Sequence, residues 1–322
     1  MPDTPRAARK ARVAAFISGA GTNMAALLYA GRLPETHFEI VLVAANDPEA
    51  PGLALAEAEG IETFALAHGG VPRAEHDAAM EAAARNAGAE YIALAGYMRI
   101  LTPGFVERWE DRILNIHPSL LPAYPGLETH RKAIEAGDPH GGCSVHLVTQ
   151  ELDAGSVLGQ AEVAIRESET AESLARRVQF AEHQLYSRVL DEWCARPFRP
   201  DWLLEELRRR ALALPESEER ESHGAPAFKL AGKSGKFFAH FSDRHHGEAH
   251  VAVLVKTSGQ EELAELVERD PDTFYRPAYY GASGWVGLVL NRKDCDWEQV
   301  DYWLERSWRA VAPGRLAAAF DI

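Results

Sequence analysis

The residues with the clearest chemical potential are an asparagine and a histidine two positions apart, Asn115 and His117. They stand at the end of the apolar run 111–116, which is typical of a buried strand, so the period of two along a strand directs both side chains to one side of a sheet. A carboxamide can stabilise a developing oxyanion, and an imidazole can do the same or move a proton. Pro118 and Pro122 would stiffen the following loop. The spacing predicts a catalytic pair, although a lone histidine at a strand end is more often structural.

A third candidate, Asp153, lies in a turn that ends at Gly155. An acid in a glycine-containing turn is most often a turn former. Next to a histidine, its carboxylate could instead raise the pKa of the imidazole and orient it, or accept a proton through water. We predict this second role, which requires Asp153 to lie within reach of His117 in the folded chain.

The segment 19–23, Gly-Ala-Gly-Thr-Asn, directly follows the apolar run 13–18 and opens a predicted helix. Glycines allow close approach of the backbone to an anion, and the N-terminus of a helix offers unpaired N–H groups with a favourable dipole. Thr22 and Asn23 add side-chain donors. Met24 stands where a dinucleotide-binding fingerprint needs its third glycine, which disfavours an NAD site. The segment therefore predicts an anion site, with a plain tight turn as the alternative.

Four further residues have weaker signals. Arg99 follows a buried strand and could bind an acidic ligand or be a solvated surface arginine. Gln179 and Glu182, three apart on a long helix, are most simply helix surface when taken alone. His146, within the run 143–150, is interpreted as a structural strand histidine.

Up to about residue 165, short apolar runs alternate with helical patterns, and each helical pattern closes at or near a glycine. The predicted strands are 13–18, 39–45, 61–66, 90–95 and 111–116, and the predicted helices between them are 23–31, 51–60 and 73–88. Apolar strands separated by helices favour an α/β fold with a mostly parallel, doubly wound sheet covered on both faces.

Two more strands and a long helix complete this part of the chain. The run 143–150 alternates and predicts a half-exposed strand, and 157–165 is its expected hairpin partner across the turn at Asp153. The stretch 170–194 predicts an amphipathic helix opened by a capping box at Ser168.

Residues 196–200 contain two prolines, which interrupt helices and strands, and a second region with a different sequence pattern follows them. We expect domains at 1–198 and 199–322, the second being a smaller α+β domain. Its predicted elements are helices at 201–212, 261–269 and 296–310, a hairpin at 226–241, and strands at 250–256 and 284–290; residues 214–224 form a polar stretch.

The composition sets limits on the class of protein. The 322-residue chain is about two domains long, with 46% hydrophobic residues and a net charge of −14. An acidic chain is poorly suited to clamp DNA or a membrane surface. Three distant cysteines favour neither a disulfide framework nor a zinc site. No signal peptide is recognised, and no apolar stretch approaches the ~20 residues of a membrane span. We expect a soluble, cytoplasmic protein.

Five segments within roughly residues 12–195 together resemble the glycinamide ribonucleotide formyltransferases, folate-dependent enzymes of purine biosynthesis. They are ISGAGTN, YIALAGYMRIL, ILNIHPSLLPAYPGLETH, SVHLVTQELDAG and VQFAEHQLY. The string NIHPSLLPAYPGL is long and specific, so the resemblance does not depend on the glycine loop. It implies a Rossmann-like sheet of formyltransferase type.

The resemblance also implies roles for individual residues. The catalytic positions of the family match Asn115, His117 and Asp153. The ribonucleotide-binding positions match Gly21, Thr22, Asn23 and Gln179 for the phosphate and Glu182 for the ribose. The folate-binding positions match Met98, Arg99, Ile100, Leu101, Val148 and Leu152, with Arg73 near the glutamate tail. Cys143 and Ser156 depart from a frequent threonine and proline without altering these groups.

The implied reaction is attack by the ribonucleotide amine on the formyl carbon of 10-formyltetrahydrofolate. Asn115 and a protonated His117 would stabilise the tetrahedral oxyanion, and Asp153 would assist proton removal through water. The resemblance requires no metal and no redox cofactor. The expected partners are glycinamide ribonucleotide and the folate, and the expected assembly is a monomer or a dimer.

The region from about residue 205 onward resembles, more weakly, the MmcQ/YjbR-like family. The resemblance rests on ALALPESEERESHGAPAFKLAGKSGKFF, on GWVGLVLN and on the terminal helix. Lysines and phenylalanines of one hairpin could contact nucleic acid, namely Lys229, Lys233, Lys236, Phe228, Phe237 and Phe238. Residues 201–322 carry 16 basic and 21 acidic residues, a net charge of −5. This balance favours a docking or dimerising domain with a hydrophobic hairpin core and solvated lysines.

Other functions fit part of the pattern. A 10-formyltetrahydrofolate hydrolase could share Asn115, His117 and Asp153, with water as the acceptor, but would bring a preceding regulatory domain. A methionyl-tRNA formyltransferase would need a basic tRNA-binding domain. A non-catalytic nucleotide-binding regulator would have no need of the Asn-His-Asp trio. An NAD-dependent dehydrogenase is disfavoured by Met24.

Overall fold

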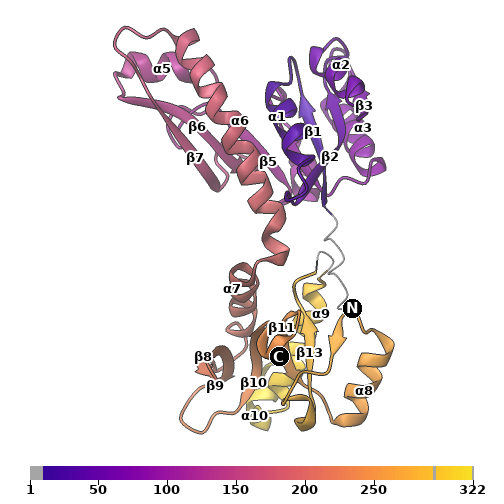
Figure 1. The fold of residues 1–322 in the computed structure, drawn as a ribbon. Coiled ribbons are helices and arrows are strands. Elements are labelled where there is room, and N and C mark those ends of the chain that lie inside the picture. Colours follow the sequence, from indigo (N-terminus) through magenta and orange to yellow (C-terminus); the bar gives the residue numbers. More distant parts are fainter. Residues whose placement is uncertain (1–9, 293–294, 321–322) are drawn as a thin grey trace. The chain divides into compact units, whose positions relative to one another are not determined.

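A computed structural model describes residues 10–292 and 295–320 (Figure 1). The chain divides into two compact units, Met1–Cys194 and Ala195–Ile322. In the part of the chain that the structure describes, no helix is long and apolar enough to cross a membrane. Each unit has its own sheet and its own hydrophobic core.

The first unit contains a seven-stranded sheet in the order β3-β2-β1-β4-β5-β6-β7. Its strands are β1 Ala11–Ile17, β2 Phe38–Ala45, β3 Glu62–Ala65, β4 Tyr91–Leu94, β5 Ile113–His117, β6 His140–Leu147 and β7 Val157–Ala164. The pairings from β3 through β5 are parallel, and those of β6 with β5 and β7 are antiparallel. The predicted mostly parallel α/β fold is confirmed.

Helices cover both faces of this sheet, as the burial of β1 shows. Alternate residues of this strand pack in two different cores. Val13, Ala15 and Ile17 pack in one core with residues of α1, α2 and α6, whereas Ala14 and Phe16 pack in another with residues of α3 and α4. The helices are α1 Thr22–Gly31, α2 Pro51–Ala58, α3 Arg73–Asn86, α4 Pro103–Arg108, α5 Thr129–Ala136 and α6 Ala171–Ala195. The short helices α4 and α5 were not predicted.

Two local predictions for this unit are wrong. The strand β6 is buried along nearly its whole length rather than half-exposed, because it lies between β5 and β7; the alternation of exposure belongs to the edge strand β7. The cap of α6 is Thr170 rather than Ser168, since the Thr170 hydroxyl accepts the backbone N–H of Ser173 at 3.2 Å.

The second unit is an antiparallel sheet with helices, in the order β12-β13-β11-β10-β9-β8. Its strands are β8 Ser217–Ser222, β9 Ala225–Leu230, β10 Phe237–Asp243, β11 Val251–Lys256, β12 Phe274–Tyr275 and β13 Trp285–Val289. Its α-helices are α7 Pro200–Ala211, α8 Gln260–Arg269, α9 Trp297–Arg309 and α10 Gly314–Phe320, with 3-10 helices η1 Arg196–Phe198, η2 His245–Gly247 and η3 Gly281–Ser283. The predicted α+β class is confirmed.

The polar stretch 214–224 contains a strand that the sequence did not predict. The strand β8 pairs only with β9 and lies at the edge of the sheet, where charged side chains are tolerated. Glu219 of this strand accepts two bonds from the guanidinium of Arg208, on α7. Lys229 is not solvated as predicted, since it is 9% exposed and donates to the carbonyl of Gly232 at 2.9 Å.

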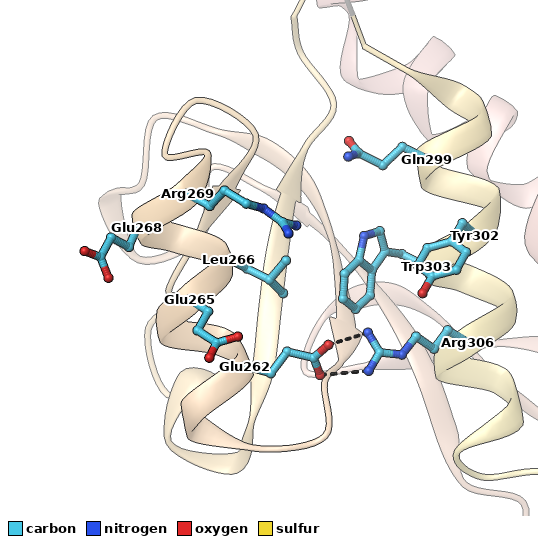
Figure 2. Close-up of a pocket in the computed structure, with 9 residues that line it drawn as sticks. All are labelled: Glu262, Glu265, Leu266, Glu268, Arg269, Gln299, Tyr302, Trp303 and Arg306. Atoms are coloured by element: carbon cyan, nitrogen blue, oxygen red, sulfur yellow. Dashed lines mark hydrogen bonds and ion pairs between the residues drawn. The ribbon is translucent and has the colours of Figure 1, made fainter.

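A cavity of about 680 Å³ opens between α8 and α9 (Figure 2). Trp303 and Leu266 are its buried apolar residues, and an ion pair between Glu262 and Arg306 spans the space between the helices. The guanidinium of Arg306 also lies 4.7 Å from the centre of the Trp303 ring. All of the residues lining this cavity belong to the second unit.

The core of the second unit depends on Trp308, whose side chain is fully buried and whose indole N–H donates to the carbonyl of Pro215 at 3.1 Å. Replacing a buried tryptophan by alanine leaves a large cavity, so Trp308→Ala should lower the free energy of unfolding of this unit by ~3–5 kcal/mol. Urea unfolding of the whole chain, with amide hydrogen exchange read in β10 and β11, measures the loss.

Tyr302→Ala, on the same helix and 59% exposed, is the matched control and should cost at most about 1 kcal/mol. Equal losses in the two variants would show that Trp308 is not a principal core residue.

Candidate active site

The carboxyl end of β5 brings four polar side chains together. In the register of β5 with β6, Asn115 lies opposite His146 and His117 opposite Ser144, so these side chains share one face of the sheet. The amide Nδ2 of Asn115 lies 3.1 Å from Nε2 of His146. Asp153, in the turn after β6, lies between the two histidines, 3.4 Å from Nδ1 of His117 and 3.6 Å from Nε2 of His146.

The surroundings of His117 define which of its nitrogens carries a proton. Its Nε2 lies 3.0 Å from the backbone carbonyl of Tyr124, which can only accept, so Nε2 is a donor. Its Nδ1 faces the carboxylate of Asp153, and both side chains are only 7% exposed. Asp153 has a positive φ of 53°, which aspartate tolerates better than most residues. Its Oδ2 also accepts the N–H of Gly126 at 2.9 Å. A protonated His117 would therefore have an acceptor for each N–H.

His146 belongs to this group, although the sequence predicted only a structural role for it. Its Nδ1 donates to the carbonyl of Leu147 at 2.8 Å, which leaves Nε2 as the acceptor for Asn115. Burial lowers the pKa of His146, in keeping with a neutral ring. His130, on α5, was also missed; burial, and then the nearby charge of His117, lower its pKa. The only sequence signal for either residue was its type.

A hydrogen-bond network holds the loop that follows His117. The buried hydroxyl of Ser144 donates to the carbonyl of Ser119 at 2.6 Å and accepts the N–H of Leu121 at 3.0 Å. Gln160 of β7 donates to the Leu121 carbonyl and to the Ser144 hydroxyl, both at 2.9 Å. The loop therefore rests on β6 and β7, which explains how Tyr124 and Gly126 reach the trio.

The predicted anion site lies at the start of α1. Gly21 precedes the helix with a φ of 68°, and a Cβ there would lie 3.0 Å from Met24 and 3.2 Å from the backbone of Gly52. Gln179 of α6 donates to the hydroxyl of Thr22 at 3.0 Å. The structure thus brings Gln179, 157 residues away in sequence, next to the helix N-terminus.

Asn23 and Glu182 form a second link between α1 and α6. The amide of Asn23 donates to Glu182 at 2.8 Å, and both residues are buried. Burial raises the pKa of Glu182, opposed first by the hydrogen bond from Asn23 and then by the positive charge of His117. The strands β1, β4 and β5 are parallel neighbours, so the start of α1, which follows β1, and the trio at the end of β5 lie at the same edge of the sheet.

The residues predicted to bind folate are distributed over several loops. Met98, Ile100 and Leu152 expose 68%, 54% and 59% of their surfaces, unusually much for large apolar side chains. Leu101 is 7% exposed and packs in a core with Val148 against it, so neither presents a free side chain. Arg99 is partly buried, and Arg73 is exposed at the first position of α3.

Among the described residues there is no group of three His, Cys, Asp or Glu side chains with the geometry to hold a metal ion. The geometry instead supplies hydrogen-bond donors, an imidazole paired with a carboxylate, and a helix N-terminus. Such groups suit acyl-type transfer to or from an anionic ligand.

Comparison with known proteins relates the two units to different families. The model of the Formyl transferase family matches residues 11–190, and that of the YjbR family matches residues 212–310. These matches agree with both predicted resemblances.

Individual relatives match the first unit. The chain is 43% identical over 182 residues to the trifunctional purine biosynthetic protein adenosine-3 of Gallus gallus, which covers 56% of this chain but only 18% of that protein. It is 40% identical to the phosphoribosylglycinamide formyltransferase of Escherichia coli, covering 57% of this chain and 86% of that one. The crystal structure of the enzyme of the same name from Brucella melitensis is 47% identical, with a TM-score of 0.56 over 58% of this chain and 97% of that chain. The chain belongs to the formyl transferase family.

Proposed function

We propose that the first unit transfers the formyl group of 10-formyltetrahydrofolate to the amine of glycinamide ribonucleotide, a step of purine synthesis. The observation that carries the proposal is the position of Asp153 between His117 and His146, with Asn115 bonded to His146, at the same edge of the sheet as the start of α1. The names of the Escherichia coli and Brucella melitensis relatives support the same activity.

The ribonucleotide is expected to bind at the start of α1. The N-terminus of this helix and the side chains of Thr22 and Gln179 offer donors to a phosphate. Glu182 accepts the amide N–H of Asn23 and retains acceptor capacity for the ribose hydroxyls. Because the start of α1 and the end of β5 lie at the same edge of the parallel sheet, a ligand bound in this way can extend toward His117.

The folate is expected to bind where apolar side chains are exposed. Met98, Ile100 and Leu152 would lose water-exposed surface against a planar ring system. Leu152 directly precedes Asp153, so a ring in this position would bring its formyl group close to the trio.

In the reaction, the amine attacks the formyl carbon, a C–N bond forms, and the bond from that carbon to the folate nitrogen breaks. Asn115 and the Nε2–H of His117 would donate to the tetrahedral oxyanion, the latter in exchange for its present bond to Tyr124. Asp153 would stabilise the protonated imidazole and accept the proton of the amine through water, and that proton passes to the leaving nitrogen. Holding both substrates in one geometry adds an orientation effect of up to ~7–11 kcal/mol.

Replacing either member of the acid–imidazole pair should nearly abolish transfer. For Asp153→Asn and for His117→Ala we expect kcat to fall at least ~10²–10³-fold, the cost typical of lost oxyanion stabilisation, while the fold is retained. Absorbance of the folate product, with circular dichroism as the check on folding, measures both. Asp111→Asn, an exposed acid at a positive φ just before β5, is the control and should behave as wild type.

Transfer at wild-type rates by either variant would rule out the proposed mechanism. Formate release by the wild type that is independent of the ribonucleotide would identify a hydrolase in place of a transferase.

Glu182 should contribute to the binding of glycinamide ribonucleotide and not to that of the folate. Because a hydrogen bond to a charged group contributes roughly 1.5–3 kcal/mol, Glu182→Gln should raise the KM for glycinamide ribonucleotide about 10- to 100-fold and leave the KM for the folate within about twofold. Steady-state kinetics with each substrate varied in turn provides the measurement. Glu192→Gln, an exposed glutamate on the same helix paired only with Arg188, is the matched control. A larger change in the folate KM would contradict the assignment of Glu182 to the ribonucleotide.

A further inference from the structure

The segment 97–102, which connects β4 to α4, is held at both ends by side chains from other elements. Near its start, the backbone N–H of Met98 donates to the hydroxyl of Ser18 at 2.8 Å. At its end, the backbone N–H of Thr102 donates to Oδ2 of Asp77 at 2.7 Å. Asp77 lies on α3, 25 residues earlier in the chain, and is 1% exposed. The conformation of the segment therefore depends on a buried carboxyl group.

The second oxygen of Asp77 has a different environment. Oδ1 is buried and lacks a hydrogen-bond partner, as do the Tyr97 hydroxyl and Nε of Arg99 at the start of the same segment. Burial, and then the charge of Asp77, raise the pKa of Tyr97, and the charge of Arg99 opposes them. The nearest ion-pair partner of Oδ1 is Nδ1 of His76 at 3.9 Å, too far for a hydrogen bond. A buried polar atom without a hydrogen bond is costly, so the position of Asp77 needs an explanation beyond packing.

Glu81, one turn further along α3, shows what a purely structural acid does in this helix. It is 7% exposed, and its oxygens accept bonds from Arg85, Arg108 and the indole N–H of Trp109. It thereby joins α3 to α4 and to the residue that ends α4. None of these bonds reaches the segment 97–102. Asp77 and Glu81 are thus both buried on the same helix, but Asp77 binds the segment 97–102 and Glu81 binds α4 and the residue that follows it.

The segment held by Asp77 presents two exposed apolar side chains. Met98 and Ile100 lie between the two bonded N–H groups, 68% and 54% exposed, whereas Leu101 between Ile100 and Thr102 is buried. This pattern of exposure follows from the conformation of the segment's backbone. Loss of the bond to Thr102 would release the end of the segment that carries Ile100.

We infer that Asp77 is a positioning residue for the folate: through the N–H of Thr102 it fixes the backbone that presents Met98 and Ile100 to the pteridine ring. This inference rests on the proposed function. Asp77 does not contact the substrates, so it should influence the binding of one of them and not the chemical step.

The test is to remove the acceptor, on Asp77, or the donor, on Thr102. Asp77→Ala should raise the KM for 10-formyltetrahydrofolate about tenfold, while the KM for the ribonucleotide and kcat stay within about twofold. Asp77→Asn keeps an oxygen for the Thr102 N–H and should restore the folate KM to within about threefold of wild type. Thr102→Pro removes the N–H donor without changing the backbone φ, because Thr102 already has the φ of −71° that proline needs, and should reproduce the effect of Asp77→Ala.

Glu81→Gln is the matched control and should lower the Tm without changing the folate KM. The inference is overturned if Asp77→Ala changes both KM values equally, or if it lowers only the Tm, as Glu81→Gln should. It is also overturned if Asp77→Ala does not fold and Thr102→Pro has the folate KM of the wild type. If the wild-type protein transfers no formyl group, the proposed function itself is overturned. If the wild type is active and the variants keep its folate KM, only the inference about Asp77 fails.

Discussion

The antiparallel pairing of β5 with β6 is the constraint on which the candidate site depends. It places His146 opposite Asn115 and Ser144 opposite His117, so one register supplies both the acceptor for the carboxamide and the support for the following loop. Because side chains alternate along a strand, a slip of one residue would turn His146 and Ser144 to the other face. Asp153 would then keep only one histidine beside it. The geometry of the candidate site is therefore a property of strand pairing rather than of any single residue.

Local sequence patterns predicted most of the regular elements, because apolar strands and amphipathic helices are determined by residues close in sequence. The period of two was enough to place Asn115 and His117 on one face. The strand β8 escaped prediction because its residues are polar and its stability comes from β9 and from Arg208. The position of His146 in the candidate site was not predicted either, since it follows from the register between two strands.

Asp77 shows a further limit of sequence reasoning. Its neighbours along α3 give no indication that one carboxyl oxygen reaches the backbone of Thr102 while the other accepts no hydrogen bond. The same holds for Asn23 and Glu182, which are 159 residues apart and meet only in the folded unit. The resemblance to the formyltransferases assigned these two residues to one ligand, but the hydrogen bond between them is visible only in three dimensions.

The helix α6 is the last element of the first unit, yet it holds the unit's earlier elements together. It donates to Thr22, accepts from Asn23, and donates from the Tyr186 hydroxyl to the carbonyls of Leu94 and Leu114. During synthesis on the ribosome, the chain would therefore expose the start of α1 without its partners until about residue 190 has emerged. The contacts at the start of α1 can be completed only at the end of translation of this unit, which ties the assembly of the candidate site to the arrival of one helix.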